Sequence, residues 1–98
     1  ASYYKEIICS EFSDEALGTR IQITGYYFLS ESDEPYISDT TGELKLVFKE
    51  GKVPDLEHGQ TARVYGETKE DALEVDHITG VNIDLSRFLH LKDLEKKL

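Results

Sequence analysis

The stretch Tyr36-Ile37-Ser38-Asp39-Thr40-Thr41-Gly42 decides how this sequence is interpreted. Its first three residues favour an extended strand, because tyrosine and isoleucine pack well on a pleated surface. Asp39 is of a type whose side chain accepts hydrogen bonds from the backbone N–H groups of a following turn, and Gly42 can adopt a positive φ. We therefore expect the strand to end in a tight turn, in which Asp39 has a structural and not a catalytic role.

Alternating strands are expected on both sides of this turn. Glu43–Phe48 alternates polar and apolar side chains, which predicts a half-buried strand that forms a hairpin with the preceding one. On the other side, an acidic loop at Ser30–Pro35 follows the strand segments Arg20–Thr24 and Tyr26–Leu29. Gly25 separates these two segments, and a glycine inside a strand is typical of a bulge or a sharp coil, which a small barrel needs in order to close.

Two more strands are expected after a long connection. Lys49–Gln60 contains glycines and a proline, and we expect a connection that includes one helical turn near Pro54–Leu56. Thr61–Gly66 and Ala72–Ile78 then alternate as strands, with a turn at Lys69–Asp71 between them.

The two ends of the sequence lie outside these strands. Tyr3–Phe12 is compatible with a helix or with an edge strand, and Ser13–Gly18 indicates a short capped turn. Residues 84–97 predict a helix, because Asp84 is a good N-cap and lysines occupy the last turns. Its apolar residues spread over roughly 220° of the helix surface, whereas one contact face needs only a little over ~100°. The residues expected to contact a protein partner are Leu85, Phe88, Leu89, Leu91, Leu94 and Leu98.

Composition restricts the possible classes of function. The 98 residues fit one domain with a small core, and no apolar run approaches the ~18–20 residues of a membrane span. The single cysteine, Cys9, permits no internal disulfide, which suits a reducing compartment, and we expect a cytoplasmic location. The three histidines are scattered, and neither H-E-x-x-H, C-x-x-C nor G-x-S-x-G occurs. We expect no catalytic residues, no metal site and no cofactor.

The net charge of −9 bears directly on partners. Nucleic-acid binders usually carry a basic surface, because the neutralisation of phosphates supplies much of their affinity. In this sequence the acids gather in loops and at the ends, while some cations fall on the predicted strands.

Three separated motifs give the sequence a family resemblance. Ile21-x-Ile23-x-Gly25, Tyr36-x-x-Asp39-x-Thr41-Gly42-x-Leu44 and Gly59-x-x-x-x-Val64-x-Gly66 resemble nucleic-acid-binding OB-fold domains over about two-thirds of the chain. The resemblance implies a mainly all-β fold, in which a five-stranded Greek-key barrel over about residues 19–83 precedes a C-terminal α-helix at about 84–97. Residues 1–98 would then form a single OB-fold domain. With its helix, the sequence is most similar to single-stranded-DNA-binding subunits of the replication protein A kind, in which this helix bundles with partner subunits.

Binding of single-stranded nucleic acid needs aromatic faces for stacking and cations for phosphates. Strand parity places both types on the outer face, although a bulge at Gly25 would invert the parity and make Tyr26 and Tyr27 interchangeable. Phe48 is added because the resemblance implies that an aromatic at this strand end stacks on a base. The expected nucleic-acid-binding residues are Arg20, Gln22, Tyr26, Tyr36, Lys45, Phe48, Lys49, Arg63 and Tyr65. The alternative interpretation is that these tyrosines pack at the barrel rim and the cations are merely solvated.

Three functional hypotheses follow. The first is a non-catalytic OB protein that binds single-stranded nucleic acid, DNA rather than RNA, within a larger complex. The second is an adaptor that assembles with a protein partner, or with itself, through the C-terminal helix and has little affinity for nucleic acid. Both hold if the chain is the acidic small subunit of a heteromeric single-strand binder. The third is a periplasmic stress-type OB protein, a family with a D-x-T-G hairpin that we do not expect to carry this helix.

Overall fold

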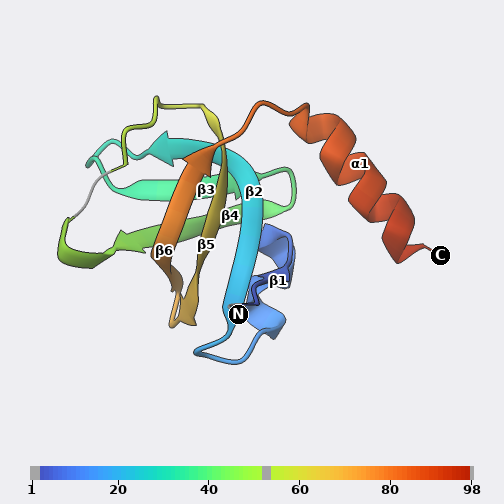
Figure 1. The fold of residues 1–98 in the computed structure, drawn as a ribbon, viewed down its shortest axis with the longest axis horizontal. Helices are drawn as coiled ribbons and strands as arrows, with labels where there is room; N and C mark the ends of the chain where they lie inside the picture. The colour runs from blue at the N-terminus through green and yellow to red at the C-terminus, as the bar shows by residue number, and fades with distance from the viewer. Residues whose placement is uncertain (1–2, 52–53, 98) are drawn as a thin grey trace.

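Five strands of the computed structural model, which describes residues 3–51 and 54–97, close into a barrel (Figure 1). They are β2 (Arg20–Leu29), β3 (Pro35–Asp39), β4 (Gly42–Phe48), β5 (Thr61–Lys69) and β6 (Ala72–Gly80). The order is β2-β3-β4-β6-β5, and β5 pairs back onto β2. Only the β4–β6 pairing within this barrel is parallel among the described residues. The expected five-stranded OB barrel with a helix after it, α1 (Leu85–Lys96), is thus confirmed.

One strand, β2, belongs to both halves of the barrel. Its residues Arg20–Tyr26 pair with β5, and Tyr26–Leu29 pair with β3. Gly25 lies next to this change of partner, where an added Cβ would stand 2.6 Å from the carbonyl oxygen of Ser38. The register runs through Gly25 without interruption, which excludes a bulge there and leaves a sharp coil of the strand as the other expected feature. The register shift occurs instead in β5, between Tyr65 and Gly66, opposite β6.

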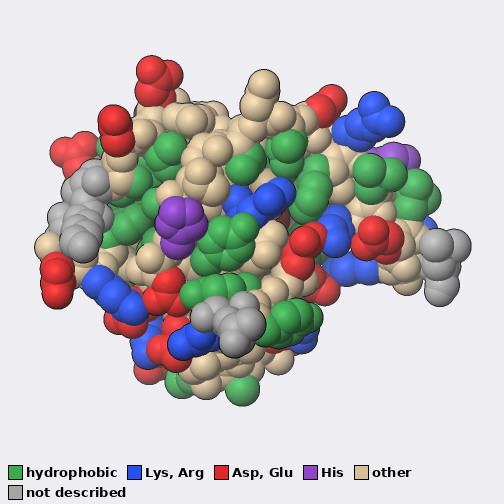
Figure 2. Space-filling view, in the orientation of Figure 1, with side chains coloured by type: hydrophobic (Ala, Val, Ile, Leu, Met, Phe, Trp, Pro, Cys, Tyr) green, Lys and Arg blue, Asp and Glu red, His purple; other side chains and the backbone are tan. Residues whose placement is uncertain are grey.

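The core follows from the alternation of the strands. Because no bulge inverts the parity of β2, Tyr27 points inward and is 1% exposed, while Tyr26 lies on the outer face. The Tyr27 hydroxyl is buried without a hydrogen-bond partner among the described residues, and burial raises its pKa. Hydrophobic side chains also reach the surface over β5 and β6 and along α1 (Figure 2). The buried core residues are Ile7, Cys9, Ile21, Ile23, Tyr27, Ile37, Leu44, Leu46, Ala62, Val64, Leu73 and Val75.

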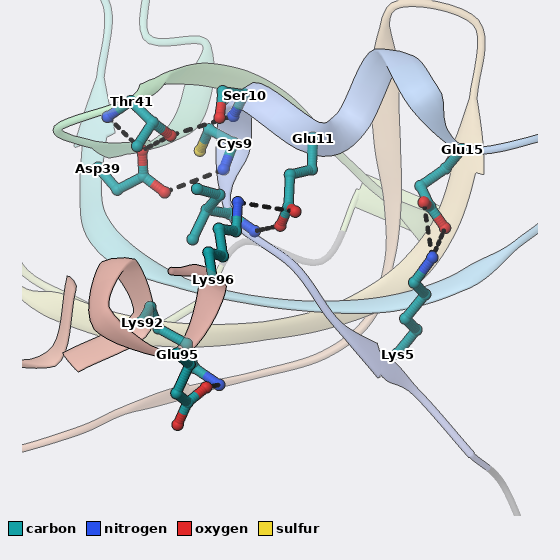
Figure 3. A network of polar contacts seen from close by, with 11 residues as sticks. Lys5, Cys9, Ser10, Glu11, Glu15, Asp39, Thr41, Lys92, Glu95 and Lys96 are labelled. Carbon is teal, nitrogen blue, oxygen red and sulfur yellow. Dashed lines mark hydrogen bonds and ion pairs between the residues drawn. The ribbon is translucent and has the colours of Figure 1, made fainter. Parts of the chain in front are cut away.

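The N-terminal segment combines the two structures that its sequence left open. A two-residue strand, β1 (Lys5–Glu6), pairs in parallel with β2, and a 3-10 helix, η1 (Cys9–Asp14), follows it. The Asp39 carboxylate ties η1 to the β3–β4 turn (Figure 3). Its Oδ2 accepts from the Cys9 N–H at 3.0 Å, and its Oδ1 accepts from the N–H groups of Thr41 at 2.8 Å and Gly42 at 3.2 Å. The predicted structural role of Asp39 in the turn is therefore confirmed.

The connection between β4 and β5 differs from expectation. A three-residue turn, η2 (Lys49–Gly51), directly follows β4 and has Glu50 in a left-handed conformation (φ 56°), whereas Pro54–Leu56 is not helical. The reason is that Leu56 packs against the core, which holds this part of the connection on the barrel. Further along, the Gly59 N–H donates to the Tyr27 carbonyl at 2.6 Å.

Helix α1 lies beside the N-terminal segment. Asp84 caps it as expected, since its side chain accepts from the Arg87 N–H at 3.2 Å. Lys92 forms an ion pair with Glu6 of β1, and Lys96 lies 2.8 Å from Glu11 of η1. In the part of the chain that the structure describes, no helix is long and apolar enough to cross a membrane.

Candidate nucleic-acid interface

Four ring side chains meet on the outer face of β2 and β3, and we call them the aromatic patch: Tyr26, Phe28, Tyr36 and His58. The Phe28 ring is at their centre, with its centroid 6.2 Å from that of Tyr26, 5.5 Å from that of Tyr36 and 5.1 Å from that of His58. Alternation of β2 points Tyr26 and Phe28 outward, and the antiparallel register sets Phe28 opposite Tyr36. The three patch residues on strands therefore follow directly from strand parity and register.

The connection before β5 completes the aromatic patch. His58 is held there because its Nδ1 accepts a hydrogen bond from the Leu29 N–H at 3.1 Å. The two tyrosines and Phe28 are half-buried, and His58 is exposed. Because the rings support one another in tilted and edge-on contacts, their outer surfaces are ordered before any ligand arrives. Such a surface is suited to stacking on planar groups.

Lys45 is the cation beside the aromatic patch. It lies opposite Tyr36 in the β3–β4 pairing, is exposed, and forms no ion pair with the described residues. Two hollows of about 230 Å³ and 340 Å³ meet at it. Their walls also include Glu34, Glu43 and Asp71. A phosphate that approaches Lys45 therefore also meets carboxylates, which weakens its binding to this chain alone.

Arg20, Gln22 and Tyr65 lie apart from the aromatic patch, where the far end of β2 pairs with β5 beside β6. The Tyr65 ring is 5.3 Å from that of Tyr4 and stacks on that of His77 at 5.9 Å. Arg20 lies over the Tyr4 ring at 5.9 Å, and Gln22 is the cross-strand neighbour of Tyr65. These residues form a second outer cluster, which we call the Tyr65 cluster.

Lys49 is engaged by acids at the edge of the Tyr65 cluster. Its ammonium group lies 2.7 Å from the Asp76 carboxylate and 3.8 Å from that of Glu74. The hydrogen bond to Asp76 raises the pKa of Lys49 and holds the pKa of Asp76 below its usual range. Tyr4 also donates to Asp76, at 3.0 Å. Lys49 therefore offers a phosphate little uncompensated charge.

Two other predicted residues have partners within the barrel. The Arg63 Nε donates to the Thr24 hydroxyl at 3.3 Å, and its side chain is half-buried on the outer face. Phe48 is half-buried against the core and lines a hollow beside β6. Its ring thus lies away from the aromatic patch, because inward parity at the end of β4 directs it toward the core.

The predicted partner-binding residues of α1 divide into three groups. Leu85 and Leu89 are 2% and 9% exposed, so the chain itself covers them, and in this arrangement they do not contact a partner. Phe88 is half-buried with the Lys92 ammonium 5.8 Å from its ring, whereas Leu91 and Leu94 are 52% and 44% exposed. Leu98 lies outside the described residues.

Phe28 and His58 are the patch residues that sequence reasoning missed. Parity alone would have found Phe28, since it shares the outward face of Tyr26. His58 is in an irregular connection, where no periodicity gives a signal. Among residues 3–51 and 54–97, no group of three or more histidine, cysteine or acidic side chains is arranged to hold a metal ion.

Comparisons with known proteins give a likeness in structure. No protein-family model matches the sequence, and no curated protein matches it. A chain of the S. pombe Stn1-ten1 complex superposes with a TM-score of 0.79 and 16% identity, covering 99% of this chain and 95% of that one. The telomere capping protein Ten1 from Saccharomyces pombe gives 0.78 and 16%, covering 98% of this chain and 100% of its own. The hypothetical protein ygiW from E. coli gives 0.65 and 13%, covering 83% and 99%. At these identities the likeness establishes a shared fold, which in the case of Ten1 spans both the barrel and the C-terminal helix.

Proposed function

We propose that this chain is a non-catalytic OB-fold subunit that binds single-stranded DNA through the aromatic patch, as part of a larger protein complex. The proposal rests on the outward rings around Phe28. These rings contact one another and lie next to Lys45. Stacking of a base on such a ring contributes about 1–3 kcal/mol and tolerates any base. The fold likeness to a telomere capping protein supports DNA as the polymer.

The charge distribution supports action within a complex. The chain carries a net charge of −9, and acids line the hollows around Lys45. Stacking is therefore the main contribution of this chain, and a more basic partner supplies most of the phosphate contacts. A structure similar to this chain is found in a two-protein complex, Stn1-ten1, which supports such an assembly. As part of the proposal we place the protein in a reducing compartment, the cytoplasm in the first instance, because its one cysteine is a buried thiol.

Titration of a labelled oligothymidine at low salt, followed by fluorescence anisotropy, tests the patch. Tyr36→Ala is expected to weaken binding by about 5- to 150-fold, which corresponds to the loss of one stacking contact. Tyr3→Ala is the matched control, because Tyr3 is 80% exposed at the N-terminal end and outside the patch. Equal affinities of the two variants, or no binding by the unmodified chain at millimolar concentration, would refute binding through the patch.

A second candidate function is that of a protein adaptor, and the exposed Leu91 and Leu94 favour it. These side chains are three residues apart and share one side of α1, as do the anchors of helix–helix contacts. Sedimentation of the chain at increasing concentration tests self-assembly through this side. Leu91→Glu with Leu94→Glu is expected to abolish an association that Lys97→Glu leaves intact. A chain that stays monomeric leaves only a different protein as partner.

A further inference from the structure

The barrel is open along part of one strand, β6. The parallel pairing of β4 with β6 joins Leu46–Phe48 to Leu73–Val75 and ends there. β6 nevertheless continues to Gly80, paired on its other side with β5. Residues 76–80 of β6 therefore form a strand edge that has no strand beside it in the described part of the chain.

The hydrogen bonds of the neighbouring ladder show which backbone groups face this edge. In an antiparallel ladder, directly opposed residues alternate between bonded and non-bonded pairs. The Val81 N–H donates to the Thr61 carbonyl at 3.0 Å, which makes Thr79 and His77 the residues that bond to β5. The N–H and C=O of Ile78 and the N–H of Gly80 then point to the open side. No hydrogen bond from the described residues occupies them.

A hollow of about 530 Å³ runs along this edge. One wall is β6 itself, from Val75 to Gly80, and the other is formed by Phe48, Lys49 and residues 54–56. Phe48, Leu56 and Ile78 give it an apolar floor, since all three pack against the core while remaining partly exposed. The volume is within the range of ligand sites, and an added strand would lie ~4.8 Å from β6.

The surroundings of this hollow are acidic. The described side chains that line it include two carboxylates, Asp55 and Asp76, and one ammonium group, that of Lys49. Lys49 already pairs with Asp76, whereas Asp55 is exposed on the opposite wall, and the chain as a whole has a net charge of −9. Hydrophobic side chains lie over β5 and β6, and acidic side chains, with lysine or arginine side chains among them, lie toward the left and lower rim of this face (Figure 2). This charge disfavours a polyanion and favours a cationic occupant.

We propose that the open edge of β6 docks an extended, cationic peptide segment of a partner protein, which adds to the barrel as a further strand. Its backbone bonds to Ile78 and Gly80, one apolar side chain rests on the floor of the hollow, and a lysine or arginine lies near Asp55. Strand addition of this kind takes affinity from backbone bonds and specificity from alternate side chains. The surface is separate from the aromatic patch, so the docking does not depend on binding of DNA there.

An amide NMR titration of the full chain tests this docking. The probe is the capped peptide Lys-Ile-Lys-Ile-Lys at low salt, and the largest shifts are expected at Ile78 and Gly80. Methylation of the probe's backbone nitrogens that face β6 is expected to weaken binding by about ten-fold or more, because each lost bond leaves a partner unpaired. Methylation of the alternate nitrogens, which face solvent, is expected to leave binding within about two-fold. Because these variants alter only the peptide, the fold of the protein is the same throughout.

Charge variants of the protein supply the second arm. Asp55→Lys is expected to weaken binding by about two- to five-fold, whereas Glu31→Lys, the same change in an exposed loop, has no effect. Equal effects of the two sets of methylated peptides would overturn the proposal, as would shifts centred elsewhere. Stronger shifts of Ile78 and Gly80 with oligothymidine would assign the edge to nucleic acid and refute it. Shifts of the free protein on dilution would assign the edge to a second copy, which equally refutes it.

Discussion

Asp39 joins two parts of the chain through one carboxylate, the 3-10 helix η1 and the β3–β4 turn. It is 7% exposed and accepts hydrogen bonds from Cys9 of η1 and from Thr41 and Gly42 of the β3–β4 turn. The Thr41 hydroxyl also donates to it. The same Thr41 oxygen accepts from the Ser10 N–H at 3.0 Å. The N-terminal segment is thus fastened to the barrel at the turn that defines the hairpin.

Asp39→Ala is expected to lower the free energy of unfolding by about 1–3 kcal/mol, because it leaves buried N–H groups without acceptors. Urea unfolding measures the change. Glu31→Ala, which removes an exposed acid, is the control and is expected to stay within about 0.5 kcal/mol of the unmodified chain.

A second measurement of the role of Asp39 is the reactivity of the Cys9 thiol. Burial raises the pKa of this thiol to about 12. Thiol labelling is expected to be slow and to accelerate in Asp39→Ala. Unchanged stability and labelling would contradict the role given to Asp39.

Tyr27 presents the opposite case, a buried polar atom without a partner. Its ring fills the core, and its hydroxyl has no hydrogen bond within the described residues. Tyr27→Phe removes this group and keeps the ring, so stability is expected to stay the same or to rise by up to about 1 kcal/mol. Urea midpoints measure the change, with Tyr36→Phe on the outer face as control. A loss of more than about 1 kcal/mol would show that the Tyr27 hydroxyl has a partner.

For single residues, the sequence predicted the direction of a side chain better than it predicted which side chains that residue contacts. Parity placed Tyr36 and Lys45 on the outer face as neighbours, and the structure brings them together. It could not place Arg20 over Tyr4 or Lys49 beside Asp76, because those contacts join segments far apart in the sequence. The uncertainty between Tyr26 and Tyr27 had a local cause, since a bulge shifts parity by one and its position depends on the partner strand.

Among the elements, the five barrel strands were predictable and the N-terminal segment was not. The strands alternate over five or more residues, which is enough for a periodic signal. By contrast, β1 has two residues and η1 has six, too few for either periodicity to emerge. The apolar spread of α1 predicted more contact than one face supplies, and the structure divides it between buried Leu85 and Leu89 and exposed Leu91 and Leu94.

Ion pairs fasten α1 to the N-terminal segment, and one of them, between Lys96 and Glu11, is expected to depend on pH. The hydrogen bond from Lys96 is the main cause that lowers the pKa of Glu11 below its ordinary 4.5, and Glu11 also accepts from the Ile8 N–H. A carboxyl group with a lowered pKa stabilises the folded state above its unfolded pKa. That contribution is lost as the pH falls through the folded pKa. The pair therefore stabilises the docked helix at neutral pH and not in strong acid.

Lys96→Met keeps the apolar stem and removes the charge. It is expected to cost about 0.5 kcal/mol or less at pH 7, since the pair is largely exposed, and to cost less at pH 3. Thermal unfolding at the two pH values provides the comparison. Lys97→Met is the control, because Lys97 pairs with Asp93 within α1 and does not join it to η1. A Lys96→Met effect that is the same at both pH values would assign the loss to packing of the stem.

The whole molecule has a charge unlike that of a domain that binds DNA on its own, since such domains usually have a basic surface. Its net charge is −9, and salt bridges within the described residues engage Lys5, Lys49, Lys69, Lys92, Lys96 and Lys97. Few cations are therefore left to displace counterions from a bound strand. On the proposed function, the aromatic patch contributes most of the affinity of this chain for DNA.

The salt dependence of binding is expected to be shallow for this reason. With Lys45 as the main phosphate contact, the slope of log K against log salt is expected near −0.7, the value for one contact on a single strand. Anisotropy titrations over a series of salt concentrations measure it. Lys45→Gln is expected to flatten the slope by about 0.7, and Lys97→Gln to leave it unchanged. A slope of about −3 or steeper would mean that several further cations contact the strand.

The division of β2 between two partners has a consequence for how the chain folds. The β3–β4 and β5–β6 hairpins join residues close in sequence, whereas closure joins Arg20–Tyr26 to Thr61–Glu67 across the intervening chain. Bringing such distant segments together costs chain entropy before any hydrogen bond of the ladder has formed to offset the loss. Non-local pairing of this kind therefore slows folding. The two hairpins can therefore form early, while the β2–β5 seam sets the rate.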